Sequence, residues 1–115
     1  MLKKQYRLLT NFEFNVVRRH GIVLKSPFFN LYFLFPRNYI GNSKVGIVTS
    51  IAFDRTAVRR NRAKRIFSEI VRLNFDKLLN NVWIVIYPKR NCLTEEYEKI
   101  NADFVKALQK ISVPK

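Results

Sequence analysis

Five cations crowd seven consecutive residues in the middle of the chain, and residues of this type at this spacing bind phosphate. The segment reads Arg59-Arg60-Asn61-Arg62-Ala63-Lys64-Arg65. Such a density of like charge is self-repulsive unless an anion lies against it. A polynucleotide backbone supplies anions at regular spacing, and guanidinium groups bind phosphates through paired hydrogen bonds. The segment therefore predicts an RNA-binding protein.

The helix expected around this segment carries its cations at the unfavourable end. The apolar pattern predicts a helix over Ala57–Leu79, with Thr56 or Asp54 as its cap. The N-terminal end of a helix is the positive end of its dipole. Each cation there is therefore unfavourable by roughly 0.3–1 kcal/mol, and the cations concerned are Arg55, Arg59, Arg60 and Arg62. A bound phosphate reverses this term, because arginines and free helix N–H groups then converge on one anion. A solvated basic face is the alternative, but the position of the cations favours phosphate binding.

The charge of the chain is large and unevenly distributed. The 115 residues include 22 Lys and Arg against 8 Asp and Glu, a formal net charge of +14. Of these, 14 basic but only 2 acidic residues lie at or before Arg65. This balance points to nucleic acid or an anionic membrane as partner. With 48% hydrophobic residues and ten Phe, the chain is too apolar for a disordered basic tail, and its length suits a single domain.

Other features narrow the class of protein. No apolar run approaches the ~20 residues that span a membrane, and the N-terminus lacks a signal-peptide core. The lone Cys92 cannot form an internal disulfide, which suits a reducing cytoplasm. One Cys and one His exclude a zinc finger or knuckle built from those ligands. We therefore expect a cytoplasmic protein with no membrane partner and no small-molecule substrate.

Hydrophobic periodicity predicts an α+β domain without internal repeats. Its expected elements are a short helix that begins with the capping box Thr10–Glu13 and stops at Gly21, strands over Phe28–Phe35 and Val45–Ser50 separated by a loop, the basic helix, a strand over Trp83–Tyr87, and a final helix capped by Thr94. Sequence alone thus favours helices and strands in one compact unit.

The same periodicity assigns faces to the elements. In the first strand the predicted core face is Phe29, Leu31, Phe33 and Phe35, and the mixed face, available to a ligand, is Phe28, Asn30, Tyr32 and Leu34. In the basic helix the predicted core stripe is Ala63, Ile66, Phe67, Ile70 and Leu73, opposite Arg60, Asn61, Lys64, Arg65, Ser68 and Arg72. In the final helix the predicted buried side is Tyr97, Ile100, Phe104, Leu108 and Ile111.

The basic segment also resembles a known signature. Ala57–Arg65, followed by Glu69 and Arg72, is similar to the RNR motif of the bacterial ribonuclease P protein subunit. Further similarities lie at the basic opening Leu2–Leu8, at Phe14 with His20-Gly21, at Phe29 with Leu31-Tyr32, and at Leu93-Thr94 before the final helix. The resemblance covers nearly the whole chain, in the right order, length and charge.

The resemblance implies a fold and a function. The fold would be a two-layer, ribosomal-protein-like sandwich in the order α-β-β-β-α-β-α, with a four-stranded mixed sheet and a left-handed βαβ crossover. General rules alone would predict a right-handed one. Ribonuclease P removes the 5′ leader from precursor tRNA, and its large RNA, working with Mg²⁺, is the catalyst. The small protein would bind that catalytic RNA and hold the leader in a cleft between the sheet and the first helix.

The resemblance and the charge pattern together give the expected site residues. The RNA-binding residues would be Lys3, Lys4, Arg7, Arg55, Arg59, Arg60, Asn61, Arg62, Lys64 and Arg65. The leader cleft would contain Phe14, Arg18, Asn30 and Tyr32. Aromatic faces stack on single-stranded bases at ~1–3 kcal/mol each without demanding a sequence, as a leader cleft requires. Core packing is the alternative role for Phe14 and Tyr32.

Several positions depart from the family pattern. Ile51-Ala52-Phe53 stands where Ser-Lys-Lys is usual, so the lysine contacts are in doubt. Arg18 replaces a second cleft aromatic, and Asn30 a small apolar residue. Tyr87 replaces a basic residue, although Lys89 and Arg90 follow closely. We therefore expect leader binding to depend more on charge and less on stacking.

Two other functions fit parts of the sequence. A protein-only nuclease would need clustered carboxylates or a general base near the scissile phosphate. Only Glu13 and Asp54 precede Glu69, and His20 suits the C-terminal end of the first helix, so we expect no catalytic residue and no protein metal site. A ribosomal or chaperone-like RNA-binding protein would share the charge and fold class, and remains an alternative. A DNA-binding protein fits less well, because no helix-turn-helix or zipper pattern is present.

Overall fold

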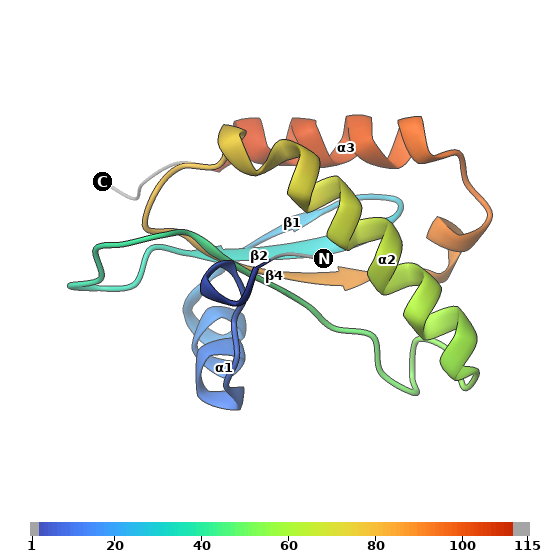
Figure 1. The fold of residues 1–115 in the computed structure, drawn as a ribbon, viewed down its shortest axis with the longest axis horizontal. Helices are drawn as coiled ribbons and strands as arrows, with labels where there is room; N and C mark the ends of the chain where they lie inside the picture. Colours follow the sequence, from blue (N-terminus) through green and yellow to red (C-terminus); the bar gives the residue numbers. More distant parts are fainter. Residues whose placement is uncertain (1–2, 112–115) are drawn as a thin grey trace.

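The order of elements confirms the predicted α-β-β-β-α-β-α pattern. The structure, a computed structural model, describes residues 3–111 (Figure 1). Its main elements are α1 (Asn11–His20), β1 (Ile22–Lys25), β2 (Phe29–Leu34), β3 (Lys44–Ile47), α2 (Ala57–Asn74), β4 (Trp83–Pro88) and α3 (Tyr97–Lys110). Short 3₁₀ helices lie at Lys4–Tyr6, Phe75–Lys77 and Arg90–Leu93.

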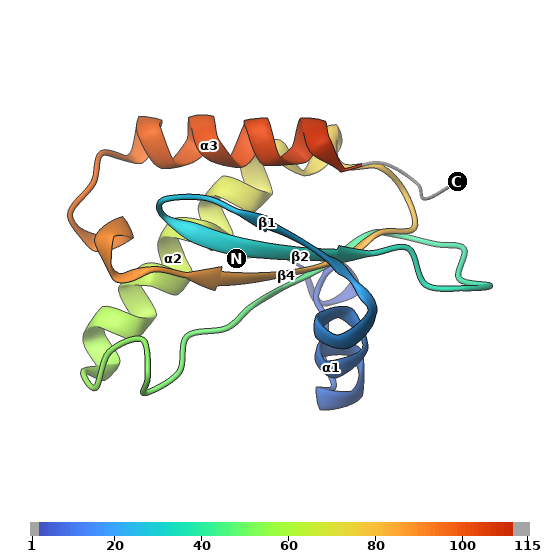
Figure 2. The same cartoon turned by 180° about the vertical axis from the view of Figure 1, so that it is seen from behind.

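The four strands form one mixed sheet in the order β1-β2-β4-β3. β2 is antiparallel to both β1 and β4, whereas β3 runs parallel to β4. α2 and α3 cover one face of the sheet, and α1 lies against part of the other (Figures 1 and 2). In Figure 1, β3 (green, not labelled) lies nearer to the viewer than its neighbour β4. From β3 the chain passes up into α2, which runs back above the sheet, and then descends into β4. This crossover is left-handed, as the resemblance implies.

The main core fills the space between the sheet and the pair α2–α3. The ring of Phe29 lies at its centre, with ring centroids 5.5 Å from Phe67 of α2 and 6.1 Å from Phe104 of α3. Such aromatic pairs contribute about 0.5–1.5 kcal/mol beyond the burial of their area. A smaller cluster of Leu8, Val17 and Val85 lies under α1 on the opposite face. The sheet is therefore fixed from both sides, but only one face is fully covered.

Local sequence explains how α1 begins and ends. The predicted capping box is present: Glu13 N–H donates to the Thr10 hydroxyl at 3.1 Å, and Thr10 N–H donates to the Glu13 carboxylate at 3.1 Å. Gly21 ends the helix, where a Cβ would press against the carbonyl oxygens of Val17 and Phe33. The chain can therefore turn directly into β1, a strand whose residues sequence analysis did not locate.

Several predicted boundaries and faces were wrong. β3 ends at Ile47 rather than Ser50. Phe28 precedes β2 and packs against the main core, not on the mixed face. Thr94 follows a 3₁₀ turn and donates to Asn91 O, so α3 begins only at Tyr97 with Glu96 as its N-cap residue. Phe28 lies in a bend and Thr94 in a turn, and each of these interrupts an element that the apolar pattern alone would extend.

The rotation of α2 differs from the predicted one. Leu73 was predicted to be buried but is 52% exposed, whereas Val71 and Asn74 are buried. The stripe through Ala63, Phe67, Val71 and Asn74 places Leu73 about a quarter turn away from the core. Ser68, predicted on the polar face, is buried as well. α2 also ends at Asn74 rather than Leu79, and its last turns face α3.

Candidate RNA interface

The amino end of α2 is tied down by Asp54. The Asp54 carboxylate accepts a hydrogen bond from Thr56 N–H at 2.8 Å and lies 3.4 Å from the guanidinium groups of Arg59 and Arg90. Thr56 occupies the N-cap position but makes no side-chain cap bond. Arg60 donates to the carbonyl oxygens of residues 54 and 55, each at 2.9 Å. Part of the positive charge is thus compensated internally, which sequence analysis did not foresee.

The remaining cations of α2 project into solvent. Arg55, Asn61, Arg62, Lys64 and Arg65 are all exposed, and none of the four cations among them makes an ion pair within residues 3–111. An exposed cation keeps its full charge available to an external phosphate, at little desolvation cost to the protein. The predicted basic face is therefore present along the first half of the helix.

Cations on α2 form two groups, one on each flank. On one flank, Arg59 and Arg62 line a hollow with Arg90, next to the 3₁₀ helix at Arg90–Leu93. On the other flank, Lys64 approaches Arg7 of the N-terminal segment. An RNA backbone crossing α2 would thus meet positive charge on both sides of the helix.

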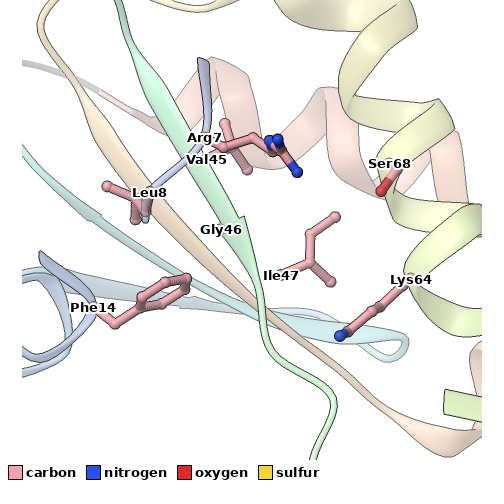
Figure 3. Close-up of a pocket in the computed structure, with 8 residues that line it drawn as sticks. All are labelled: Arg7, Leu8, Phe14, Val45, Gly46, Ile47, Lys64 and Ser68. Carbon is pink, nitrogen blue, oxygen red and sulfur yellow. The ribbon is translucent and has the colours of Figure 1, made fainter. Parts of the chain in front are cut away.

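Arg7, Lys64 and Ser68 surround a hollow of about 180 Å³ beside β3 (Figure 3). Residues 7 and 8 run along the free edge of β3, with Leu8 N–H donating to Val45 O at 3.2 Å. Figure 3 shows Arg7 and Lys64 extending toward the hollow from opposite sides.

The hollow lacks a counter-ion of its own. None of the residues that line it is acidic. The Arg7 Nε atom is buried and has no hydrogen-bond partner in the described part of the chain. A buried charged donor without a partner is costly, and an entering anion would remove that cost. The charge and the unpaired donor of this hollow therefore suit the binding of one phosphate group.

The face of the sheet beside α1 carries the predicted cleft residues. Phe14 of α1 lies over β3, and a Cβ at Gly46 would overlap its ring. Tyr32 of β2 packs edge-to-face on Tyr87 of β4, with ring centroids 5.5 Å apart. Phe14, Tyr32 and Tyr87 all pack against the small cluster under α1 and remain partly exposed. Each ring therefore contributes to packing and also offers surface to a ligand.

Polar groups extend this face toward β1. The strand register places Val23 beside Tyr32 and Lys25 beside Asn30. Asn30 Oδ1 is buried and has no hydrogen-bond partner among residues 3–111. Arg18 is exposed one helical turn after Phe14, and its guanidinium lies 3.5 Å from Asn15 Oδ1. The four predicted cleft residues thus come from α1 and β2, on the same side of the sheet.

The other predicted cations lie at the edges of these surfaces. Lys3 and Lys4 are exposed at the N-terminal 3₁₀ helix. The ring of Tyr6 packs on the ring of Phe75, with ring centroids 4.6 Å apart, and holds this helix in place. Lys89 donates to Ser26 O at 2.8 Å, so its ammonium group is held within the protein. The positions that depart from Ser-Lys-Lys form a turn in which Ile51 is 72% exposed and Phe53 packs on the main core.

Among residues 3–111 no group of three His, Cys, Asp or Glu side chains could hold a metal ion. His20 is exposed at the last turn of α1. Burial raises the pKa of the Cys92 thiol to about 11. Across the same residues no helix is long and apolar enough to cross a membrane.

The family model, the curated relatives and the solved structures that this chain matches all belong to one protein family. The sequence model of the family described as Ribonuclease P matches residues 2–112. The chain belongs to the ribonuclease P protein family. The ribonuclease P protein component of Finegoldia magna is 35% identical over 96% of this chain and 95% of that relative. The same component of a Nitratiruptor species is 29% identical over 96% of this chain and 95% of its own length.

Solved structures of ribonuclease P proteins share the fold. The protein from Thermotoga maritima has a TM-score of 0.79 at 24% identity, over 93% of this chain and 98% of that one. A mutant of the Staphylococcus aureus protein has a TM-score of 0.80 at 22% identity, over 92% of this chain and 87% of that one.

Sequence analysis of this ribonuclease P family member missed two features of the interface. Tyr87 was noted only as a lost cation, yet it packs on Tyr32 and adds a second aromatic ring to the sheet face. The alternation of side chains along β4, which puts Tyr87 on the same face as Val85, could have signalled this role. The pairing of Arg7 with Lys64 had no local signal, because 56 residues separate them along the chain.

Proposed function

We propose that this protein binds the catalytic RNA of ribonuclease P and the 5′ leader of precursor tRNA, and thereby assists removal of the leader. Membership of the ribonuclease P family makes it the protein component of an RNA-containing endoribonuclease. The finer assignment of RNA partners to surfaces is our inference. We place this activity in the cytoplasm, a reducing compartment that suits the free, buried Cys92.

The observation that carries the proposal is that a basic surface and an aromatic surface lie on either side of β3 and adjoin each other. On one side, Arg62, Lys64 and Arg65 of α2 are exposed and make no ion pair among residues 3–111. On the other, Phe14, Tyr32 and Tyr87 form an aromatic face. The hollow at Arg7 and Lys64 includes Phe14 in its lining and so joins the two. Charge suits a structured RNA backbone, and aromatic rings suit single-stranded bases.

These surfaces suggest a division of roles. We assign the α2 cations and the N-terminal lysines to the catalytic RNA, whose folded backbone presents phosphates at many angles. We assign Phe14, Arg18, Asn30 and Tyr32, with Tyr87, to the leader, which enters as a single strand. Stacking is tolerant of sequence, so one cleft can accept the leaders of different precursor tRNAs.

The chemistry itself is assigned to the RNA. The family implies Mg²⁺, but the described side chains offer no cluster of ligands that fits a divalent ion. We therefore propose that the catalytic RNA and the substrate would hold the Mg²⁺ that the reaction requires. The protein would contribute by neutralising phosphates and by fixing the leader relative to the RNA.

Reconstitution tests this function. The purified chain is mixed with a bacterial ribonuclease P RNA and precursor tRNA at low Mg²⁺, and 5′ cleavage is followed against RNA alone and protein alone. We expect a large rise in cleavage with both components and none with protein alone. Tight RNA binding without any rise would indicate a ribosomal or chaperone-like RNA-binding protein instead. Cleavage by the protein alone would contradict the absence of a catalytic site.

A further inference from the structure

We propose that a second groove, on the opposite side of α1 from Phe14, binds one unpaired nucleotide of the RNA partner. Phe12, Val16 and His20 of α1 form one wall. The other walls are the end of β2, the loop that follows it, and Trp83 at the start of β4, around a hollow of about 720 Å³. The inference rests on the proposed RNA-binding function.

Helix geometry separates this groove from the leader cleft. Residues two apart on a helix point about 200° away from each other, so Phe12 and Phe14 lie on opposite sides of α1. Val17, between these two sides, is fully buried against the sheet. α1 therefore divides the uncovered sheet face into two separate surfaces. The leader cleft uses one, and the groove at Phe12 is not needed for it.

The lining suits an aromatic ligand. Phe12 is 72% exposed although it borders the groove. Tyr39 packs edge-to-face on Trp83, with ring centroids 5.3 Å apart, and Lys44 Nζ lies 5.9 Å from both rings. These contacts fix one aromatic wall, so little ordering is needed when a base stacks in the groove.

An unpaired donor strengthens the case for a base. The indole Nε1 of Trp83 is buried, yet it has no hydrogen-bond partner within the part of the chain that the structure describes. Buried tryptophan N–H groups usually find a partner. A base carbonyl or ring nitrogen is an acceptor of the required kind, and would arrive together with the stacking surface that the groove offers.

The charge of the groove selects among possible occupants. Arg37 lines it with His20, and none of its ten lining residues is acidic. A second copy of the chain would bring two surfaces of a +14 protein together, which is self-repulsive. An apolar peptide would leave Arg37 without an anion. A nucleotide suits both the aromatic lining and Arg37, because its base stacks on the rings and its phosphate pairs with the guanidinium.

The test uses Phe12→Ala in the full chain. Since Trp83 is the only tryptophan, its fluorescence should be quenched when RNA binds to the wild type. Phe12→Ala should lose most of the quenching and bind RNA about 5- to 160-fold more weakly, the effect of removing one stacked base. The dependence of affinity on salt should not change, because stacking releases no counterions.

Two further variants act as controls. Phe12→Tyr keeps the ring and should retain wild-type affinity and quenching. Ile40→Ala removes an apolar side chain that is 91% exposed and lies outside the groove lining, so it should behave as wild type. All three are measured with ribonuclease P RNA alone and with precursor tRNA added to the holoenzyme. If Phe12→Ala loses affinity in only one of these two measurements, the RNA used in that measurement supplies the nucleotide.

Two outcomes would overturn the proposal. One is equal affinity of Phe12→Ala and Ile40→Ala in both arms. The other is self-association of the wild type that Phe12→Ala abolishes without weakening RNA binding, which would make the groove a contact between copies. Either result leaves the proposed function standing so long as the wild type stimulates cleavage, so the two failures are distinguishable.

Discussion

The ring of Phe14 rests on the backbone of β3 at Gly46, where the absence of a side chain makes room for it. A Cβ at position 46 would overlap the ring atoms Cε1 and Cζ of Phe14. The distance between α1 and β3 is thus set by one glycine. Because α1 forms a wall of the proposed leader cleft and β3 borders it, the width of that cleft depends on this contact.

Gly46→Ala should therefore reduce both stability and leader binding. Overpacking typically costs about 1–3 kcal/mol, and here the displaced group is an aromatic ring of the cleft. Urea unfolding measures the first effect, and the ratio of affinities for leader-bearing and mature tRNA in the holoenzyme measures the second. Gly41→Ala is the matched control, since the atoms nearest to its added Cβ belong to the side chain of Tyr39, at 3.2 Å or more. Lower stability with an unchanged ratio would give Phe14 a packing role alone.

Sulfate should stabilise the fold more than chloride does at equal ionic strength. Arg7 and Lys64 border one hollow without a carboxylate, so a dianion that binds there favours the folded state by mass action. The gain is about 2.7 kcal/mol at 100 times the dissociation constant. Thermal unfolding in the two salts measures it. Arg7→Met should lose most of the difference, and Lys106→Met, at an exposed lysine of α3, should keep it. Equal shifts in the wild type would rule out the anion site.

Local rules predicted the elements whose signals are local. The capping box needs only Thr10 and Glu13, and the alternation along β2 places Phe29 and Tyr32 on opposite faces without further information. The exposure of Leu73 could not be predicted in this way, because it depends on how α2 rotates against α3. β1 was missed since most of its residues are exposed and carry no alternating apolar signal.

In the candidate site, too, some features have a local sequence signal and others depend on the tertiary fold. The cations of α2 are evident from the sequence, and the proposed cleft residues come from the resemblance and stay a prediction. The part that could not be predicted is long-range: Asp54 meets Arg90 across 36 positions of sequence. Such contacts decide which cations are free for RNA, and only the tertiary fold determines them.

Arg65→Ala should flatten the salt dependence of RNA binding without destabilising the protein. Arg65 is exposed and makes no ion pair among the described residues, so its loss removes only an external contact. The slope of log K against log[salt] should become less negative by about 0.7–0.9, one phosphate contact. Binding over a salt series measures this. An unchanged slope would place Arg65 off the interface.

Arg60→Ala should have two effects. It should flatten the slope in the same way, and it should also lower the melting temperature. Arg60 donates to the carbonyl oxygens of Asp54 and Arg55 at the start of α2, and these bonds are lost with the side chain. Arg65→Ala is the control for the second effect. A melting temperature equal to that of Arg65→Ala would show that these two bonds do not stabilise the helix start.

The carboxylate of Asp54 should make stability fall at acid pH. The hydrogen bond from Thr56 N–H, together with Arg59 beside it, lowers the pKa of Asp54 below its ordinary value of 3.8. A carboxyl with a lower pKa in the folded state stabilises the fold above the unfolded pKa, and this contribution is lost as pH falls through the folded pKa. Asp54→Asn should therefore melt at a lower temperature than the wild type at pH 7.

The two proteins should converge in melting temperature as pH falls through the folded-state pKa of Asp54, because the protonated carboxyl resembles Asn. The comparison is made as a difference, because Glu13 and Glu69 also have lowered pKa values and titrate in both proteins. A difference that stays constant down to low pH would mean that Asn fails for geometric reasons. In that case the ion pairs with Arg59 and Arg90 would contribute nothing, and both arginines would be fully available to RNA.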